Sequence, residues 1–452
     1  MRPDLPALAL LSLLTGATAG AAKGPGLHSF TLDNGLTVVV VEDRRAPAVT
    51  QMLWYRVGSA DEAPGQSGTA HFLEHLMFKA TDKLAEGEFD RTVEENGGTF
   101  QAFTSTDHTA FVEHIASDRL DLVMGMEADR MVNLAPTEAS VLSEREVVQE
   151  ERKQEVEGDP GGAFYEQLLA ALYPDSPEGR PTIGSEDEIG ALTRDKAMAF
   201  YRAHYAPSNA VLVVAGEVGS DEVRRLAERH FAAIPSATLA ARPDRPPEPP
   251  RPSVPRIEVH DARVPLPQIT RLYLAPRRRA GDQADAAALV VLADLLGAPR
   301  ATSIMARDLM RHDGIALAAE ASYSPTGIGQ QEFGLYLVPV PGVAPADAEA
   351  ALDALIARFI EQGPDPQEIE RIRGRVRGNN VYMIDDVRGR ASYIGEALAS
   401  GLTLEDVEAW PAVLEQVTVE DVRRVARDVF RNQNSVTGWL MPPADLAEGP
   451  QN

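Results

Sequence analysis

Apolar positions along the chain follow two different spacings. Short runs rich in valine, isoleucine and aromatic residues predict strands, and longer stretches with apolar residues every third or fourth position predict helices. The expected strands cover residues 36–41, 49–55, 99–103, 109–113, 210–215, 269–274 and 435–440. The expected helices cover residues 70–78, 118–133, 138–156 and 286–296. Because the two kinds mix without strict alternation, the pattern favours an α+β fold over a doubly wound sheet.

A proline-rich stretch at residues 242–252 interrupts this pattern. Such proline density cannot continue a helix or a central strand, and it makes a semi-rigid extended linker. We therefore expect two domains of similar size, residues 27–238 and 257–443, joined by a linker at 239–256.

The two halves share a local order of elements. A Thr-x-Asp/Glu signal for a helix start, an amphipathic helix and an asparagine before a strand occur in both. The matching positions are Thr193, Asp195, Phe200, Tyr205 and Asn209 in one half and Thr418, Glu420, Val425, Phe430 and Asn434 in the other. This predicts duplicated α/β sandwich domains, with chance similarity of two helix–strand units as the alternative.

Composition narrows the possible functions. The chain has 452 residues, 43 basic and 68 acidic, so its net charge is −25. We expect neither nucleic-acid nor anionic-membrane binding, because both need a basic surface. The chain has no cysteine. Disulfides, thiolate metal sites and a cysteine nucleophile are therefore excluded.

The first residues resemble an export signal. Arg2 precedes an apolar run over residues 5–14, which small residues follow up to Ala22. This order predicts a cleavable signal peptide, residues 1–22, cut between Ala19 and Ala22, and a periplasmic location. The run is too short to span a bilayer, so no membrane anchor is expected. A disordered N-terminal tail is the alternative.

The segment His-Phe-Leu-Glu-His at residues 71–75 carries the clearest chemistry. In a helix, His71, Glu74 and His75 share one face. Two imidazoles one turn apart can bind one zinc ion, and the carboxylate between them can act as a base, which is the inverted zincin order. We expect one Zn²⁺ per chain. A pair of surface histidines is the alternative, which the apolar neighbours disfavour.

A third zinc ligand is expected from the helix at residues 138–156. Its apolar stripe is predicted to contain Val141, Val147 and Val148, and Glu144 and Glu151 fall on the same stripe. Carboxylates on a buried stripe need partners. One glutamate would bind the metal, and the other would accept a hydrogen bond from a metal-bound imidazole. A solvated acidic face is the alternative.

These segments resemble the pitrilysin/insulinase metallopeptidases, which include the mitochondrial processing peptidase. The resemblance covers residues 30–442 and is closest over 68–218. The supporting segments are residues 71–78, 95–98, 102–104, 144–151 and 179–184. It implies that Glu151 is the third zinc ligand and Glu144 the partner of an imidazole. Glu150 would be the ligand in a shifted register, but it falls off the stripe.

The resemblance also implies a substrate path. Family members bind peptides as an added strand beside the strand that corresponds to residues 99–104. Gln101, Ala102 and Phe103 are therefore candidate substrate contacts. Gln101 stands where the family usually has asparagine, which changes the reach of the amide but not its hydrogen-bonding groups.

A second departure concerns the C-terminal half. The family commonly has an arginine and, shortly after it, a tyrosine that hold substrate and stabilise the oxyanion. Arg311 is present, but Leu317 stands at the tyrosine position and cannot donate a hydrogen bond. We therefore expect a homo- or heterodimer in which a related subunit supplies the Arg/Tyr element.

The sequence as a whole predicts a zinc endopeptidase that acts on peptides or small unfolded polypeptides, with Glu74 as general base. Two alternatives remain: a non-catalytic interaction subunit of a larger complex, and a zinc hydrolase that acts on another amide. His108 and His114 are interpreted as polar or packing positions rather than as ligands.

Overall fold

A computed structural model of the chain describes residues 26–236, 242, 245–249, 251, 253–298 and 301–443. The predicted signal peptide, residues 1–22, lies outside the described part of the chain. Among the described helices, none is both long enough and apolar enough to cross a membrane.

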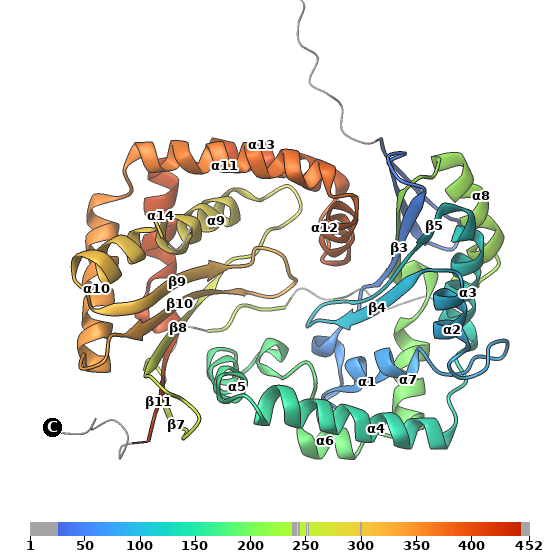
Figure 1. Cartoon of the computed structure of the whole chain (residues 1–452), viewed down its shortest axis with the longest axis horizontal. Helices are drawn as coiled ribbons and strands as arrows, with labels where there is room; N and C mark the ends of the chain where they lie inside the picture. The colour runs from blue at the N-terminus through green and yellow to red at the C-terminus, as the bar shows by residue number, and fades with distance from the viewer. Residues whose placement is uncertain are drawn as a thin grey trace, which may run out of the picture.

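The N-terminal half forms a mixed sheet, of which Figure 1 labels β3, β4 and β5. Its described strands have the order β1-β2-β6-β3-β5-β4. The strands are β1 (Leu27–Thr31), β2 (Thr37–Glu42), β3 (Ala48–Tyr55), β4 (Thr99–Thr104), β5 (Thr109–Ala116) and β6 (Ala210–Gly216). The helices are α1 (Thr69–Leu76), α2 (Glu88–Glu95), α3 (Leu120–Asn133), α4 (Glu138–Arg152), α5 (Pro160–Leu172), α6 (Glu186–Gly190), α7 (Arg194–His204) and α8 (Ser220–Phe231). Strand β4 is an edge strand of this sheet.

The C-terminal half forms a second sheet, with the order β7-β11-β8-β10-β9. Its described strands are β7 (Arg256–His260), β8 (Gln268–Ala275), β9 (Ala316–Tyr323), β10 (Gln331–Pro339) and β11 (Ser435–Met441). Its helices are α9 (Ala284–Gly297), α10 (Pro345–Gln362), α11 (Pro366–Asp385), α12 (Val387–Ala399), α13 (Leu404–Gln416) and α14 (Val419–Val429).

The two sheets repeat one topology. Without β1, the strands of each half, taken in chain order, occupy the same places in the two sheets. In each half the last strand pairs in parallel with the first and antiparallel with the second. Thr193 and Thr418 cap the matching helices α7 and α14 by accepting backbone N–H bonds. The prediction of duplicated α/β sandwich domains is confirmed.

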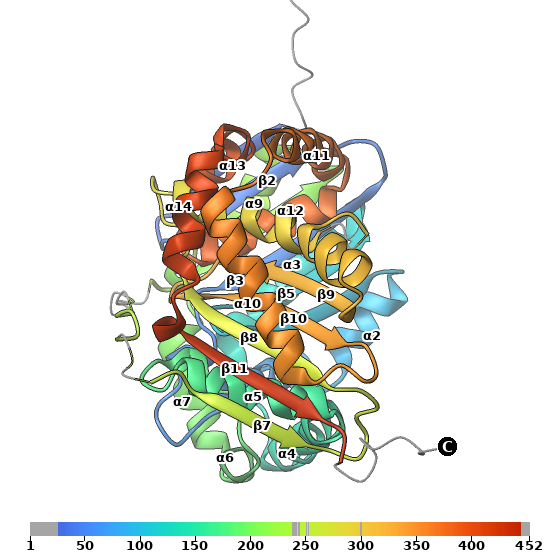
Figure 2. The same ribbon diagram turned by 90° about the vertical axis from the view of Figure 1, so that its left-hand side faces the viewer.

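Each half buries one sheet face under its own helices and the other face under a helix of the opposite half. Helix α12 packs on β3 and β6, where Ile394 and Ala397 join Trp54 and Val213 in one apolar cluster. Helix α5 packs on β7, β8 and β11, beside which it lies in Figure 2. Each half thus contributes one helix to the sheet of the other half. Without the opposite half, each sheet would have only one face covered.

The described residues of the proline-rich segment are tied to the N-terminal half by ion pairs. Arg242 pairs with Asp61, and the Arg245 guanidinium lies 2.7 Å from a carboxylate oxygen of Asp107. The other oxygen of Asp107 accepts the backbone N–H of Ile328, which lies between β9 and β10, at 2.8 Å. Asp107 therefore joins the linker and the C-terminal half to the turn between β4 and β5.

Candidate metal centre

The start of helix α1 is fixed by a buried carboxylate. Glu62, which is 4% exposed, accepts the backbone N–H groups of Gly68 at 3.0 Å and of Ala70 at 2.7 Å. Gly68 has φ = 84°, and a Cβ there would lie 2.5 Å from the carbonyl oxygen of Ile183. Only glycine suits this position, and the acceptor satisfies amides that a helix start leaves unpaired.

Helix α1 presents His71, Glu74 and His75 on one side and an apolar face on the other. Phe72 and Leu73 are fully buried in the core of the N-terminal half. The rings of His71 and His75 are one turn apart, with centroids 4.8 Å from each other. The apolar face anchors the helix, so the imidazoles have a fixed direction.

Helix α4 supplies the glutamates. Val141 and Val148 are buried, as expected, and hold α4 against the domain. The prediction for Val147 is wrong, because its side chain is 45% exposed. Six positions turn a helix by about 600°, so Val147 points about 120° away from Val141. The buried stripe is therefore narrower than predicted, with Glu144 and Glu151 beside it.

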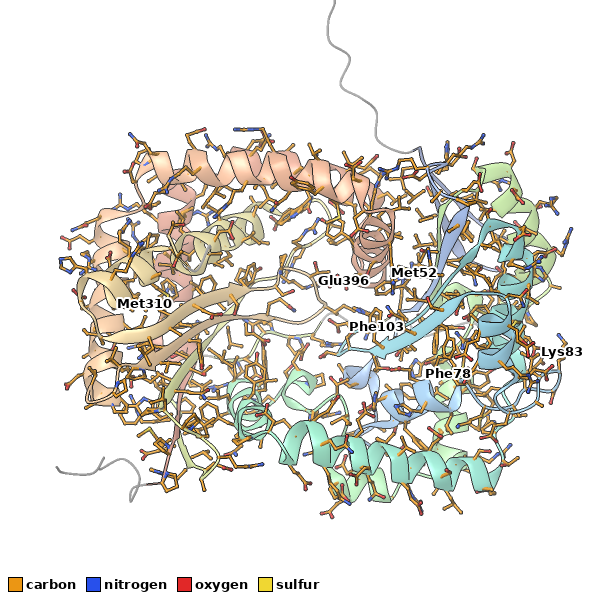
Figure 3. The ribbon with its side chains drawn as sticks, in the orientation of Figure 1. Met52, Phe78, Lys83, Phe103, Met310 and Glu396 are labelled. Atoms are coloured by element: carbon orange, nitrogen blue, oxygen red, sulfur yellow. The ribbon has the colours of Figure 1, made fainter. Side chains whose placement is uncertain are left out.

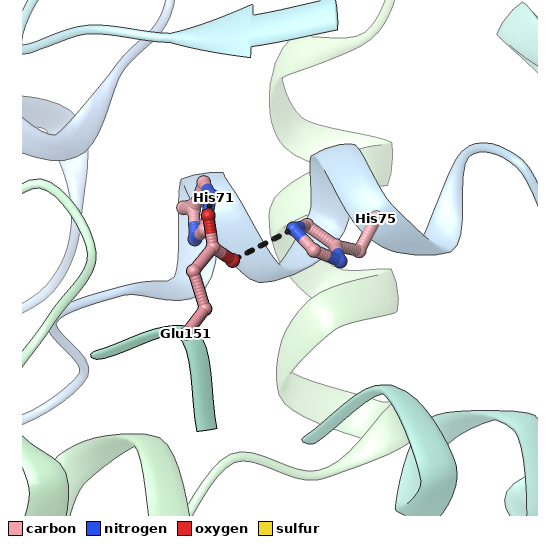
Figure 4. A group of neighbouring side chains, drawn as sticks. All are labelled: His71, His75 and Glu151. Carbon is pink, nitrogen blue, oxygen red and sulfur yellow. Dashed lines mark ion pairs between the residues drawn. The ribbon is translucent and has the colours of Figure 1, made fainter. Parts of the chain in front are cut away.

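Three side chains converge as a possible ligand set. His75 Nε2 lies 3.4 Å from Glu151 Oε2, and His71 Nε2 lies 3.8 Å from Glu151 Oε1 (Figure 4). One ligand atom from each of the three residues lies within 4.8 Å of the others. Ligands about 2 Å from a tetrahedral zinc lie roughly 3.3 Å apart. The two distances from Glu151 to the histidines are close to this value, whereas the limit of 4.8 Å for the whole set is wider. Two imidazoles and one carboxylate also form a known donor set for catalytic zinc.

The second nitrogen of His75 has its own partner. His75 Nδ1 lies 3.2 Å from Glu144 Oε2, and Lys79 Nζ lies 2.5 Å from Glu144 Oε1. Burial favours a higher pKa for Glu144, but the His75 and Lys79 contacts outweigh it and lower the pKa. Glu144 is thus kept as a carboxylate that can accept a hydrogen bond from Nδ1–H and leave Nε2 for a metal.

The other groups of the cluster are influenced chiefly by burial. Burial, with a smaller effect of His75, lowers the pKa of His71 to about 4, so His71 stays neutral and able to bind a metal. Burial raises the pKa of Glu151 and of Glu74, and the hydrogen bond from Thr104 opposes the shift at Glu74. A positive ion at the centre would favour the ionised form of both carboxylates.

Strand β4 lies beside α1, and its residues alternate between two environments. Ala102 packs against the core that contains α1, and Thr104 Oγ1 donates a hydrogen bond of 2.6 Å to Glu74 Oε2. Gln101 is exposed, and the ring of Phe103 packs edge-on against Trp54 on the opposite face. Of the candidate substrate residues, Ala102 is therefore on the α1 face of the sheet.

Arg311 and Leu317 belong to the C-terminal half. Arg311 is exposed on a short π-helical turn (Ala306–His312) that packs against β9, and Leu317 is exposed on β9 itself. In Figure 3, the neighbouring residue Met310 and Phe78, which follows α1, lie on opposite sides of the molecule. The turn that contains Met310 is therefore on the other side of the molecule from the segment that follows α1.

Sequence reasoning missed three residues around the site: Glu62, Lys79 and Thr104. Strand alternation could have indicated Thr104, which lies two positions from Ala102 on the same face. Lys79 lies four positions after His75, near the end of the helix. At this spacing two side chains can contact the same carboxylate. Glu62 had no local signal, because its partners are backbone amides of a later segment.

The motif and its glutamate partner define an inverted zincin arrangement on a duplicated sandwich fold. Residues 37–186 match the family model for insulinase (peptidase family M16), and residues 191–376 match the model for the peptidase M16 inactive domain. The chain belongs to the peptidase M16, or insulinase, family, as the resemblance in sequence predicted.

Similar proteins span nearly the same length. Zinc protease PqqE of Helicobacter pylori is 30% identical over 427 residues, which cover 92% of this chain and 93% of that protein. An uncharacterised zinc protease of Mycobacterium leprae is 29% identical and covers 91% of both chains. The crystal structure of a protease from Helicobacter pylori superposes with a TM-score of 0.85 at 28% identity, over 92% of this chain and 100% of that one.

Proposed function

We propose that this chain is a zinc-dependent endopeptidase with one zinc ion held by His71, His75 and Glu151. The observation that carries the proposal is the convergence of these three side chains beside Glu74, a carboxylate that is only 8% exposed. A site for a purely structural ion has no need of a base on the same helix face. The relatives named zinc proteases support the same function.

Glu74 is the general base in the proposed mechanism. Bound zinc would polarise the peptide carbonyl and lower the pKa of a nearby water. Glu74 accepts a proton from the attacking water and returns it to the departing amine. Glu144 orients His75 through Nδ1. The buried side of α1 holds the helix in place, so that His71, Glu74 and His75 keep fixed positions relative to one another.

The substrate is proposed to bind as an extended strand along the free edge of β4. An added strand pairs through its backbone, which suits a peptidase with broad side-chain tolerance. Gln101, Ala102 and Phe103 are the proposed contacts. Because β4 also contains Thr104, a peptide on this edge would lie close to Glu74.

A second subunit is proposed to complete the site. Leu317 cannot donate a hydrogen bond to a developing oxyanion, and Arg311 lies in the other half of the chain. A related subunit in a homo- or heterodimer would supply the Arg/Tyr element. We also propose that the chain is exported to the periplasm. Its proposed domains are residues 27–238 and 257–443, joined by a linker at residues 239–256.

The deciding experiment compares the purified mature chain with Glu74→Gln on a mixed set of fluorogenic peptides. The variant should keep zinc, measured by metal analysis, and lose turnover by roughly 10²- to 10⁴-fold, because the amide cannot act as a base. His71→Ala should lose both zinc and turnover. Cleavage by Glu74→Gln at the parental rate would refute the assignment.

The partner hypothesis has its own outcome in this assay. Full, chelator-sensitive activity of the chain alone would refute it. If neither the parent nor the variant cleaved any peptide, two explanations would remain: a missing subunit or a non-catalytic role. Repeating the assay with a related subunit added would then separate these two possibilities.

A further inference from the structure

Thr104 is the direct protein partner of the Glu74 carboxylate. Its hydroxyl lies 2.6 Å from Glu74 Oε2 and comes from the last residue of β4, a different element from the helix that carries Glu74. A carboxyl side chain on a helix otherwise has free rotation about its outer bonds. A short bond to a second element removes this freedom.

The neighbouring hydroxyl fixes the direction of this bond. Thr109 Oγ1 lies 3.4 Å from Thr104 Oγ1 and donates its own proton to the carbonyl oxygen of Val57 at 3.1 Å. A hydroxyl has one proton to donate. The Thr109 proton is therefore committed, and the Thr104 proton goes to the carboxylate.

Thr104 itself is held firmly. It pairs with Thr109 at the closed end of the β4–β5 hairpin. The turn that follows is fixed by the backbone bond from Ser105 N–H to the His108 carbonyl, at 2.8 Å. Phe103, the preceding residue, is packed against Trp54. A donor on such a rigid support can hold a carboxylate within a few tenths of an ångström.

We propose that Thr104 is a positioning residue for the general base: its hydroxyl fixes Oε2 of Glu74, so that the other oxygen is presented to the attacking water. This inference rests on the proposed function, because it assigns Thr104 a role in the same reaction. The Thr104 hydroxyl is placed against Glu74 and Thr109, and in this role it binds neither the zinc ion nor the substrate. Its contribution should therefore be to turnover, and not to zinc or peptide affinity.

The test compares Thr104→Val, Thr104→Ser and the parent chain, with Thr270→Val on β8 as a matched control in the other sheet. Valine keeps the branched shape that suits a strand and lacks the hydroxyl, whereas serine keeps the hydroxyl. Thr104→Val should lower kcat by about 10- to 100-fold, the usual effect of one hydrogen bond to a charged group. KM, zinc content and Tm should stay near the parental values, and Thr104→Ser should recover most of kcat.

A merely structural role would instead lower Tm or zinc content, or would affect serine and valine variants equally, and either result would overturn the proposal. Crystal structures of the parent and Thr104→Val add a readout that does not depend on activity. Glu74 should adopt one conformer against Thr104 in the parent and several in the variant. An unchanged Glu74 conformer in Thr104→Val would overturn the positioning role even if the chain cleaved no peptide. Failure of the proposed function itself would instead be shown by Glu74→Gln cleaving peptides at the parental rate.

Discussion

The Nδ1 atom of His75 lies 3.2 Å from Glu144, whose other carboxylate oxygen contacts Lys79. This arrangement leaves Nε2 of His75 facing Glu151 at 3.4 Å. One glutamate of α4 thus sets the direction of the imidazole, and another, two turns further along the helix, faces the position where a metal would bind. The division of roles between the two glutamates is open to direct test.

Glu144→Gln should weaken zinc binding by about 10- to 100-fold, the usual effect of removing the acceptor behind a metal-bound histidine. The amide cannot balance the charge of Lys79 and is a weaker acceptor for Nδ1–H. Glu146→Gln, an exposed position on the same helix, is the control and should bind zinc as the parent does. Competition with a chromophoric chelator measures both affinities, and equal affinities would contradict the assigned role.

Glu151→Gln should have the larger effect on zinc. It removes the proposed third ligand, so affinity should fall by more than it does in Glu144→Gln. Glu150→Gln provides the register control, because its exposed side chain lies outside the cluster of His71, His75 and Glu151. Metal analysis after dialysis distinguishes the two variants. Zinc loss from Glu150→Gln and retention by Glu151→Gln would reverse the assignment.

The packing of α12 on the opposite half predicts a stability effect at Gly395. A Cβ there would lie 2.1 Å from Nε1 of Trp54, a fully buried residue. Gly395→Ala should therefore destabilise the chain by about 1–3 kcal/mol through overpacking. Gly378→Ala in α11 meets no neighbouring atom and should be neutral or stabilising by up to about 1 kcal/mol. Urea unfolding followed by circular dichroism measures both, and equal effects would argue against close packing between the halves.

His108 predicts a loss of stability in mild acid. Burial lowers the pKa of His108 from 6.5 to about 4. Between these values the unfolded chain binds a proton that the folded chain does not, so the free energy of unfolding falls as pH decreases from 6.5 to 4. The full loss for this residue is about 3 kcal/mol. His108→Phe keeps a ring beside Trp54 and should flatten this part of the stability profile, and an unchanged slope would exclude His108 as its source.

The sequence by itself predicted the duplication, the histidine helix and part of the secondary structure, but it did not predict strands such as β1, β9 and β10. Valine-rich runs such as the one in β2 and the threonine caps of α7 and α14 are local signals, since period and capping depend on near neighbours. His71, Glu74 and His75 were found in the same way, because one helical turn fixes their relation. Glu144 and Glu151 were placed on one side of α4 by the same periodicity, although the extent of the buried stripe was misjudged at Val147.

Only the tertiary structure decided what these elements meet. The bond between Thr104 and Glu74 joins a strand to a helix 30 positions earlier, and the approach of Glu151 to the two histidines depends on how α4 packs against α1. The exchange of α5 and α12 between the halves has no sequence signal, because an apolar helix face does not specify which sheet will cover it. Local spacing determines which side chains share a surface, whereas long-range packing determines which surfaces come together, and a site assembled from several elements needs both.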